Sequence, residues 1–515
     1  MAVISEKKTN SCQLLINNEW VDSQAQTFGD IFNPSSGEII AKVPMGGADD
    51  VHKACVSASR AFEQWRHTPV FERARYMFTF LKLLEENKEK IARQVTVEHG
   101  KTFSESLASV QRGIEMVEFA SSIPNLMQGE FMENIARGVD CETVRQPIGV
   151  CAGITPFNFP AMVPLWMYPV AITCGNTFIL KPSEKVPLTS MMIADILLQT
   201  GLPAGVFNLV HGGRDCVNAL LEHPDIRGIS FVGSSNVAKY VYETGTRNGK
   251  RVQAAGGAKN HLIIMPDANI DFTTKALQAS AFGCSGQRCM AGSLAVTVGD
   301  VHEPLMENLV KTAKNMKVGR TDIADAKSEP DLGPVVSLEH MKKVKSYIDT
   351  GVSEGANLLL DGRKVETAEK NGFYVGPTIF DKAKPEMKIA KEEIFGPVLT
   401  VVSVKNLDEA LNLGNKCDYG NGAVIFTNSG KSAREFKLKF NAGMIGVNVG
   451  VPAPLAWFSF SGWNSSFYGD LHIQGKEAIY FYTQQKLTMT RWFDEESKPT
   501  TKFQDPIWKQ NKLDS

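Results

Sequence analysis

Short apolar stretches alternate with helix-forming segments through the middle of the chain, and this alternation restricts the fold more than any other feature. The predicted buried strands cover residues 148–154, 177–180, 206–210 and 229–232. A helix is predicted over residues 188–200, because Gly201 and Pro203 follow it, and a second helix follows the turn Gly233-Ser-Ser235. Strands that alternate with helices in this way predict a doubly wound α/β sheet of the Rossmann type.

A second α/β series follows, from about Leu294 to Val449. Its predicted strands cover residues 294–298, 399–402, 423–426 and 444–449. Residues 130–146 and the aromatic stretch 478–484 are predicted to be edge strands that pair across an interface. With 515 residues, the chain is too long for one hydrophobic core, so two or three domains are expected.

Bulk composition narrows the class of protein. Hydrophobic residues make up 43% and charged residues 22%, as in soluble globular proteins, and the net charge of -1 provides no general attraction to nucleic acid or to anionic membranes. The nine cysteines form an odd number and no CxxC pair, which favours reduced thiols in the cytoplasm and predicts no metal site. The longest apolar run, Ala161 to Cys174, is interrupted by Pro164 and Pro169 and is too short to span a membrane.

One cysteine lies in a segment suited to covalent catalysis. Cys289 follows Arg288 in the sequence Phe282-Gly-Cys-Ser-Gly-Gln-Arg-Cys-Met-Ala291, whose glycines would be poor choices in a packed helix or strand. Arg288 is expected to lower the pKa of a neighbouring thiol or to bind an anion. The alternative is a buried structural cysteine, which is the common role of free cysteines and the role assigned here to Cys284.

Neither this segment nor Ala254-Ala-Gly-Gly-Ala-Lys-Asn-His261 contains an acidic residue. A nucleophilic thiol without a nearby carboxylate base indicates an acyl-enzyme that is transferred to an acceptor better than water. Attack on a carbonyl also requires donors for the oxyanion, and Asn158 in Thr155-Pro-Phe-Asn-Phe-Pro160 is the candidate. Considered alone, Asn158 is better explained as a turn residue.

Two segments at strand ends suggest a nucleotide site. Lys181 and Glu184, in Lys181-Pro-Ser-Glu-Lys185, follow a predicted strand and could bind ribose hydroxyls, where the carboxylate would disfavour a 2′-phosphate and so select NAD over NADP. The alternative is a proline-opened helix start with an acid in its first turn. Gly233 and Ser234 stand at a strand-to-helix junction, where main-chain N–H groups can bind a pyrophosphate. Because the spacing is not GxGxxG, this segment alone is better explained as a plain strand-to-helix turn.

Five motifs occur in the order and spacing of one enzyme family. They are Pro156-Phe-Asn-Phe-Pro160, Lys181-Pro-Ser-Glu184, Phe231-Val-Gly-Ser234, Gly286-Gln-Arg-Cys289 and Glu392-Glu-Ile-Phe-Gly-Pro397. Together they resemble the aldehyde dehydrogenase superfamily, over about residues 15 to 492. Within it, Gly256-Gly-Ala-Lys-Asn-His261 and Phe458-Ser-Phe-Ser-Gly462 resemble the CoA-acylating branch that oxidises methylmalonate and malonate semialdehydes. Hydrolytic members carry a glutamate where this chain has Ala254.

The resemblance implies a reaction. The Cys289 thiolate attacks the aldehyde, its own N–H and the Asn158 amide hold the oxyanion, and hydride passes to NAD. Coenzyme A then takes the acyl group and the β-carboxylate leaves as CO2 or bicarbonate, so that the products are propionyl-CoA or acetyl-CoA. The alternative is a hydrolytic, NAD-dependent aldehyde dehydrogenase for another carboxylated semialdehyde. Valine and inositol breakdown are both compatible with this family.

The resemblance also implies the binding residues. The residues expected to line the NAD site are Thr155, Phe157, Lys181, Glu184, Lys185, Ser234, Gly256, Glu393 and Phe395, of which the last two would hold the nicotinamide ribose. Arg112 and Arg288 are the expected partners of the substrate carboxylate. Arg112 faces away from the main apolar stripe of its helix, which also fits a solvated surface arginine, and Arg288 could instead form a structural ion pair.

The resemblance finally implies a three-part architecture. The NAD-binding domain would comprise residues 1–128 and 149–254, and the catalytic domain residues 255–469. An oligomerisation element would comprise 129–148 and 470–492, followed by a polar tail, 493–515. The expected assembly is a homodimer or a dimer of dimers. The expected partners are the small-molecule semialdehyde and CoA, without nucleic acid or membrane.

Overall fold

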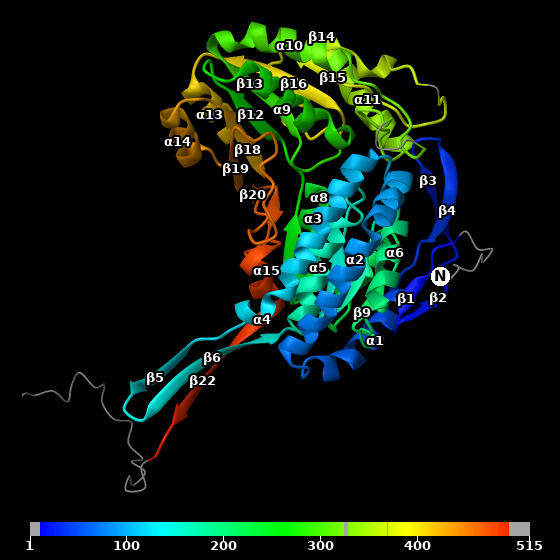
Figure 1. Cartoon of the computed structure of the whole chain (residues 1–515), viewed down its shortest axis with the longest axis vertical. Coiled ribbons are helices and arrows are strands. Elements are labelled where there is room, and N and C mark those ends of the chain that lie inside the picture. The colour runs from blue at the N-terminus through cyan, green and yellow to red at the C-terminus, as the bar shows by residue number, and fades with distance from the viewer. Residues whose placement is uncertain (1–10, 324–327, 368, 494–515) are drawn as a thin grey trace, which may run out of the picture.

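Two sheets in two lobes and a protruding arm make up the molecule. The computed structural model describes residues 11–323, 328–367 and 369–493. In Figure 1 one sheet with its helices forms the lower lobe, the other forms the upper lobe, and a three-stranded arm extends from the lower lobe. The expected α/β class with a Rossmann-type sheet is confirmed.

The lower lobe is built on an eight-stranded sheet of order β2-β1-β9-β8-β7-β10-β11-β21. Its strands are β1 (Leu14–Ile16), β2 (Glu19–Val21), β7 (Val150–Ile154), β8 (Thr177–Lys181), β9 (Phe207–Leu209), β10 (Ile226–Val232), β11 (Arg251–Ala255) and β21 (Phe467–Tyr468). The five strands from β9 to β11 are parallel. Their carboxyl ends therefore meet along one edge, where open sheets of this kind bind ligands.

Helices cover both faces of this sheet. They are α1 (Ala48–Trp65), α2 (Val70–His99), α3 (Phe103–Ser121), α4 (Ile123–Leu126), α5 (Met162–Thr173), α6 (Leu188–Leu198), α7 (Arg214–Glu222) and α8 (Ser235–Arg247). Every residue of β7 and β8 is buried, since alternate side chains enter two different cores: Phe178 and Leu180 pack in one and Ile179 in the other.

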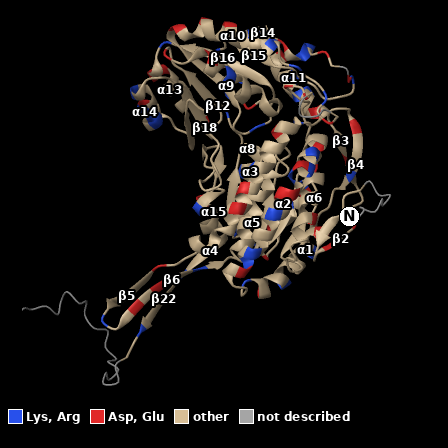
Figure 2. Ribbon diagram, in the orientation of Figure 1, with Lys and Arg blue, Asp and Glu red and all other residues tan. Residues whose placement is uncertain are grey.

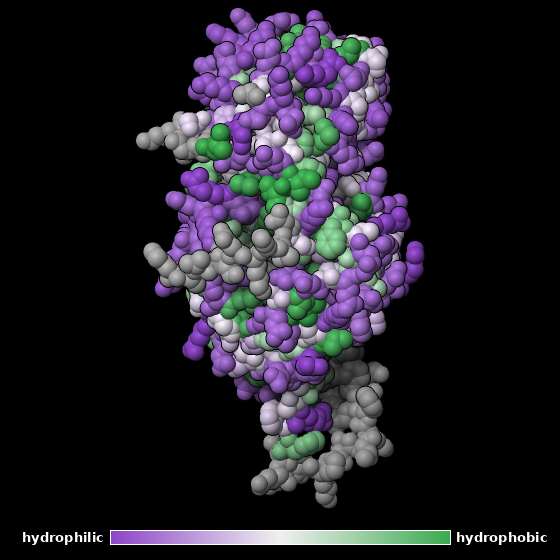
Figure 3. All heavy atoms as spheres, turned by 90° about the vertical axis from the view of Figure 1, so that its right-hand side faces the viewer, coloured by the Kyte–Doolittle hydropathy of each residue, from purple (hydrophilic) through white to green (hydrophobic). Residues whose placement is uncertain are grey.

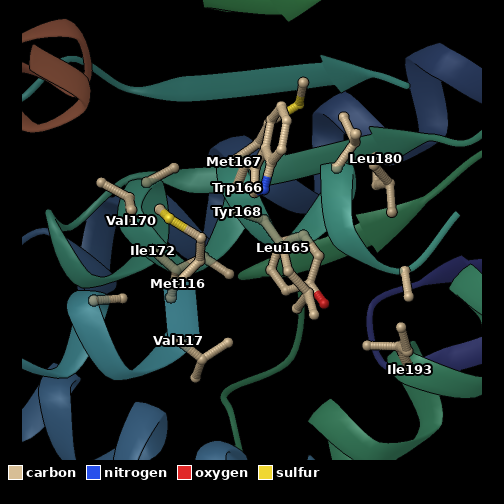
Figure 4. Packing of buried hydrophobic residues seen from close by; sticks show 14 of the residues in the cluster. Met116, Val117, Leu165, Trp166, Met167, Tyr168, Val170, Ile172, Leu180 and Ile193 are labelled. Atoms are coloured by element: carbon tan, nitrogen blue, oxygen red, sulfur yellow. The ribbon is translucent and has the colours of Figure 1, made fainter. Parts of the chain in front are cut away.

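The contact between α3 and α5 positions one wall of the site. Met116 and Val117 of α3 lie in one apolar cluster with Leu165 and Trp166 of α5 (Figure 4). Gly113 makes this close approach possible, because a Cβ atom added there would lie 2.7 Å from Leu165 Cδ1. Arg112, next to Gly113, is thereby held at the edge of this core.

The upper lobe contains a seven-stranded sheet of order β14-β15-β16-β13-β12-β18-β19, in which only β14 and β15 pair antiparallel. Its strands are β12 (Asn260–Ile264), β13 (Gly292–Val298), β14 (Asn357–Leu360), β15 (Thr378–Asp381), β16 (Val398–Val404), β18 (Gly422–Phe426) and β19 (Met444–Val447). Its helices are α9 (Ile270–Phe282), α10 (His302–Lys314), α11 (Leu338–Ser353), α12 (Lys388–Lys391), α13 (Leu407–Asn415) and α14 (Gly430–Lys439). The chain crosses between the lobes at residues 256–259, between β11 and β12.

The arm consists of β5 (Phe131–Ala136), β6 (Val139–Pro147) and β22 (Thr483–Arg491), paired antiparallel in the order β22-β6-β5. Phe131, Met132, Leu487 and Met489 are exposed on it. The prediction of an edge strand over 478–484 is wrong for most of that stretch. Residues Gly475–Tyr482 form helix α15, because Ala478, Ile479, Phe481 and Tyr482 are buried at helical spacing, and the strand begins at Thr483.

Smaller elements complete the chain. They are the pairs β3 (Phe28–Asn33) with β4 (Glu38–Pro44) and β17 (Tyr419–Gly420) with β20 (Trp463–Asn464), and the 3₁₀ turns η1 (Gly283–Gly286), η2 (Gly299–Val301) and η3 (Gly362–Lys364). The domain boundaries given above remain a prediction. Apart from residue 493, the predicted polar tail lies outside the described residues.

The surface is mixed in character. Charged residues are spread over the outer helices of both lobes (Figure 2), and hydrophobic residues form separate patches within a hydrophilic surface on the face in Figure 3. In the part of the chain that the structure describes, no helix has both the length and the apolar composition needed to cross a membrane.

Candidate active site

A strained loop carries Cys289 between α9 and β13. Cys284, Ser285 and Gly286 all have positive φ angles, of 54°, 53° and 67°. Gly286 cannot be replaced without movement, because a Cβ atom there would lie 2.0 Å from the main-chain oxygen of Gly396. Gly286 therefore allows a tight turn next to Cys289, which agrees with the expectation that the glycines of this segment do not belong to a packed helix or strand.

Two asparagines hold the main chain at the thiol. The Nδ2 atoms of Asn260 and Asn421 donate to the main-chain oxygen of Cys289, at 2.7 and 3.1 Å. Asn260 Nδ2 also donates to the oxygen of Ala291, at 2.8 Å. Sequence reasoning assigned no role to either asparagine. Asn260 stands in a motif already noted, whereas nothing near Asn421 in the sequence points to the site.

Cys289 lies where two cavities meet. The arginine cavity, of about 340 Å³, is lined by Arg112, Glu115, Met116, Arg288 and Cys289, among others. The glycine cavity, of about 160 Å³, is lined by Asn158, Gly256, Gly257, Glu393 and Cys289, among others. Phe159 and Trp166 line both cavities. The thiol can therefore be approached from two sides.

Asn158 is buried beside the thiol segment. Its Nδ2 atom donates to the main-chain oxygen of Gln287 at 3.1 Å, and its own main-chain oxygen accepts from Lys101 Nζ. A side-chain amide has two N–H donors, so the bond to Gln287 leaves one free. The structure brings Asn158 and Cys289 together at the glycine cavity.

The thiol of Cys289 is protonated in this environment. Burial and then the Glu393 carboxylate raise its pKa to about 12, whereas Arg288 and the N–H groups of Met290 and Cys289 lower it less. Arg288 thus acts on the thiol in the expected direction, but burial and Glu393 outweigh it, and the net shift is upward. The fold brings a carboxylate near the thiol and partly buries it, and neither effect is visible in the local sequence.

That carboxylate is Glu393. Its Oε1 atom accepts from the N–H of Ala258 at 2.9 Å, and burial raises its pKa to about 7 in spite of Ala258, Lys343 and Lys259, which lower it. A thiol without a nearby carboxylate was expected, and this is wrong, because Glu393 is distant in sequence and lines the same cavity as Cys289. At the position of the glutamate in hydrolytic relatives, Ala254 is fully buried in β11.

The expected NAD residues fall into two groups. Phe157, Ser234, Gly256, Glu393 and Phe395 line the glycine cavity. The residues outside its lining are Thr155, Lys181, Glu184 and Lys185. Thr155 and Lys181 stand at the carboxyl ends of the neighbouring strands β7 and β8, and the N–H of Thr155 donates to the oxygen of Lys181 at 3.2 Å.

The second group carries the charges suited to a ribose. Lys181 Nζ donates to the oxygen of Gly212 at 2.7 Å and to Glu184 Oε2 at 3.3 Å. Burial acts to raise the pKa of Glu184, but Lys181 and the other donors outweigh it, and the net shift is downward. Lys185 Nζ lies 5.5 Å from the ring centroid of Phe157, which connects this group to the glycine cavity.

The glycine cavity has the features of a dinucleotide cradle. A Cβ atom at Gly256 would lie 2.7 Å from Ser235 Oγ, and one at Gly257 would lie 2.4 Å from Glu393 Oε2, so side chains at these positions would fill the space. Ser234 caps α8 without a side-chain hydrogen bond to the helix, which leaves the first N–H groups of α8 for an anion. These residues fit NAD. In the described ranges no three His, Cys, Asp or Glu side chains gather as a metal site would require.

Both predicted substrate arginines line the arginine cavity. Arg112 Nη1 pairs with Glu115 Oε2 at 2.9 Å, and about half of the Arg112 side chain is exposed. Arg288 Nη2 donates to the oxygen of Ala279 at 2.8 Å, whereas its buried Nε atom has no hydrogen-bond partner in the described part of the chain. An unsatisfied buried donor is costly, so a ligand acceptor at this position would be favoured.

Comparisons with known proteins agree with this geometry. The profile of the aldehyde dehydrogenase family matches residues 20–488. The malonate-semialdehyde dehydrogenase 1 of Oceanobacillus iheyensis is 49% identical over 94% of this chain and 99% of its own length. The malonate-semialdehyde dehydrogenase of Halalkalibacterium halodurans is 50% identical over 93% of this chain and 97% of its own length.

Solved structures show the same similarity. The methylmalonate-semialdehyde dehydrogenase of Oceanimonas doudoroffii is 44% identical and superposes with a TM-score of 0.91 over 94% of this chain and 99% of that chain. A Sinorhizobium meliloti protein, assigned as a methylmalonate-semialdehyde dehydrogenase and solved with NAD bound, is 43% identical with a TM-score of 0.92 over 95% and 99%. By sequence, by fold and by the residues gathered around its thiol, the chain belongs to the aldehyde dehydrogenase family.

Proposed function

We propose that this enzyme oxidises malonate semialdehyde and methylmalonate semialdehyde with NAD and CoA, forming acetyl-CoA and propionyl-CoA with loss of the carboxylate. The observation that carries the proposal is the position of Cys289, between a cavity that contains two arginines and a cavity with the features of a dinucleotide cradle. Relatives named for malonate and methylmalonate semialdehyde, at 44–50% identity, support the substrate class.

In this proposal Cys289 loses its thiol proton to solvent and attacks the aldehyde carbon as a thiolate. A new carbon–sulfur bond forms, and the carbonyl oxygen becomes an oxyanion. The free N–H of the Asn158 amide and the N–H of Cys289 donate to that oxyanion, so the charge is stabilised where it develops. Asn260 and Asn421 hold the adjoining main chain in place.

NAD held at the glycine cavity would supply the hydride acceptor for the former aldehyde carbon. Lys181 and Glu184 bind hydroxyls of the adenosine ribose, and the α8 N-terminus after Ser234 binds the pyrophosphate. Glu393 and Phe395 orient the nicotinamide ribose at the glycine cavity. The acyl group then remains on Cys289 as a thioester. Its β-carboxylate leaves as CO2 or bicarbonate, and a proton from solvent takes its place on the α-carbon.

Resolution of the thioester by CoA needs no carboxylate base. A thiol acceptor is more acidic and more nucleophilic than water, so it can attack where no base deprotonates it. The buried Ala254 takes the place of the glutamate of the hydrolytic members. Arg112 and Arg288 bind the substrate carboxylate in the arginine cavity.

One observation favours the hydrolytic alternative. Glu393 lines the cavity of Cys289 with a pKa of about 7, which suits a general base for water. Its hydrogen bond with Ala258 and its expected contact with the nicotinamide ribose compete with that role. CoA dependence separates the two functions.

The test is NADH formation from malonate semialdehyde with and without CoA. We expect rapid turnover only with CoA and acetyl-CoA as the product by mass spectrometry. Full turnover without CoA, with release of the free acid, would replace this proposal by the hydrolytic one. Cys289→Ala should abolish turnover, whereas Cys141→Ser, which changes a partly exposed thiol in the arm, should not.

We also propose an assembly and a compartment for this enzyme. The exposed apolar residues of the arm support a homo-oligomer, a dimer or a tetramer, in which the arm pairs with another copy. Light scattering at micromolar concentration tests this, and a monomer would contradict it. A cytoplasmic location remains a prediction from the odd number of cysteines.

A further inference from the structure

A lysine is buried behind the thiol site without a carboxylate partner. Lys101 follows Gly100, whose φ angle of 90° ends α2 and turns the chain inward. A Cβ atom at Gly100 would lie 2.6 Å from Pro334 Cγ, so this turn requires glycine. Lys101 is only 2% exposed as a result.

The ammonium group of Lys101 contacts two neighbours of the thiol site. Its Nζ atom donates to the main-chain oxygen of Asn158 and lies 3.5 Å from the centroid of the Phe159 ring. No Asp or Glu in the described part of the chain lies within ion-pair distance of it. The two acids nearest in sequence bond to main-chain N–H groups instead: Glu98 accepts from Leu188 and Thr189. Glu105 accepts from Cys284 and Thr102.

A buried cation without a paired carboxylate is costly, and a methionine would fill the same space without that cost. We expect a buried, unpaired lysine where its positive charge stabilises a negative charge that forms nearby during the reaction. The titratable groups that interact with Lys101 are His99 of α2, Glu105 of α3, and Cys284, Arg288 and Cys289 of the thiol segment. The proposed reaction makes one of these groups, Cys289, negative.

We propose that Lys101 is a positioning residue of the reaction: its ammonium holds the Asn158 main chain so that the amide faces the oxyanion, and its charge favours the Cys289 thiolate. This role rests on the proposed function, since it assigns the thiolate and the oxyanion to Cys289. Burial lowers the pKa of Lys101, while Cys284, Glu105 and Cys289 oppose that shift, so negative charge at the thiol favours the charged lysine.

The first test is alkylation of Cys289 by iodoacetamide in the absence of NAD, followed by peptide mass spectrometry from about pH 7 to about pH 10. In Lys101→Met we expect Cys289 to be labelled about tenfold more slowly at each of these pH values, because the thiolate fraction falls. In turnover we expect kcat to fall about 10- to 100-fold while KM for the semialdehyde changes little, because Lys101 does not touch the substrate.

Lys250→Met is the matched control. Lys250 is also buried and donates to the main-chain oxygens of His223 and Ile226 at 2.6 and 3.0 Å, but it lines neither cavity of the thiol. It should leave the alkylation profile unchanged. A double variant, Asn158→Ala with Lys101→Met, should lose less activity than the product of the two single losses, because the positioning part of the Lys101 effect requires the Asn158 amide.

An unchanged alkylation profile and unchanged kcat in Lys101→Met would overturn the proposal, and so would equal losses in Lys101→Met and Lys250→Met. If Lys101→Met does not fold, as judged by NAD binding, Lys101→Arg and Lys101→Gln carry the comparison: the arginine should keep the wild-type profile and the glutamine should shift it, and equal profiles would refute the role. Alkylation needs no turnover, so these outcomes are independent of the CoA test.

Discussion

Asn158 and Gln287 are joined by a 3.1 Å hydrogen bond from the side-chain amide to the main-chain oxygen two residues before Cys289. This bond connects the loop after β7 of the lower lobe with the thiol loop of the upper lobe. The oxyanion site is therefore assembled between two lobes, and its donors come from segments about 130 residues apart in the sequence, as the separation of 129 between the bonded residues shows.

Asn158→Ala should lower kcat by about 10²- to 10³-fold, because one oxyanion donor is lost. Steady-state NADH formation measures this, and NAD binding by fluorescence should stay near the wild-type value. Asn415→Ala is the control, since Asn415 also donates its amide to a main-chain oxygen, that of Lys439, at an exposed position. Equal kcat values in Asn158→Ala and the wild type would remove Asn158 from the mechanism.

Glu393→Gln should make Cys289 more reactive in the enzyme without NAD. The Glu393 carboxylate raises the pKa of the thiol to about 12 together with burial, so its neutralisation lowers that pKa and increases the thiolate fraction at any pH below it. Iodoacetamide labelling across a pH series measures the effect.

The wild-type labelling rate should still rise with pH through the whole alkaline range, because the thiol titrates late. Glu392→Gln is the control for Glu393→Gln, since the half-exposed Glu392 accepts from Tyr347 Oη at 2.6 Å and lines neither cavity of the thiol. Slower labelling in Glu393→Gln than in the wild type would contradict the assigned cause.

Arg112→Gln and Arg288→Gln should each raise KM for malonate semialdehyde by about 10- to 100-fold, the loss expected for one hydrogen bond to a charged group. KM for propanal, which has no carboxylate, should change little. We expect the larger effect from Arg288, because it is less exposed and its Nε atom is unsatisfied. Parallel losses with both aldehydes would show that the arginines support the structure instead of binding the carboxylate.

Glu184→Gln should weaken the preference for NAD over NADP. The Glu184 carboxylate is kept ionised by Lys181, and its charge would repel a 2′-phosphate. The ratio of kcat/KM for the two cofactors measures the preference. Glu339→Gln removes an exposed carboxylate 3.9 Å from Lys185 and should leave the ratio unchanged; an unchanged ratio in Glu184→Gln as well would place the selection elsewhere.

Gly113→Ala should destabilise the fold by about 1–3 kcal/mol, because the added methyl group forces α3 away from Leu165 of α5. Thermal unfolding measures this. Gly430→Ala is the control. A Cβ atom there would have no neighbour within 4 Å, and alanine has a higher helix propensity than glycine, so this variant should not be destabilised. A Gly113→Ala protein as stable as the wild type would show that the two helices separate easily.

The chain order of strands, helices and motifs was readable from the sequence, because each depends on neighbouring residues. The alternation of apolar stretches predicted the lower sheet, and five short motifs indicated the family. The helix Gly475–Tyr482 was mistaken for a strand, since a short aromatic run fits both periods until its burial against a core is known. The strand Asn260–Ile264 was not predicted, because it follows closely after the paired glycines Gly256 and Gly257.

Local sequence determined the identity of the thiol loop and of the residues that can do chemistry, since turns, caps and nucleophiles are properties of short segments. Only the tertiary structure decided that Glu393 and a water-poor pocket raise the thiol pKa, that Asn421 anchors Cys289, and that Lys101 lies buried behind Asn158. These contacts form only when segments of both lobes pack around the thiol loop. The pKa values depend on distances between groups and on solvation, which cannot be read from the order of residues along the chain.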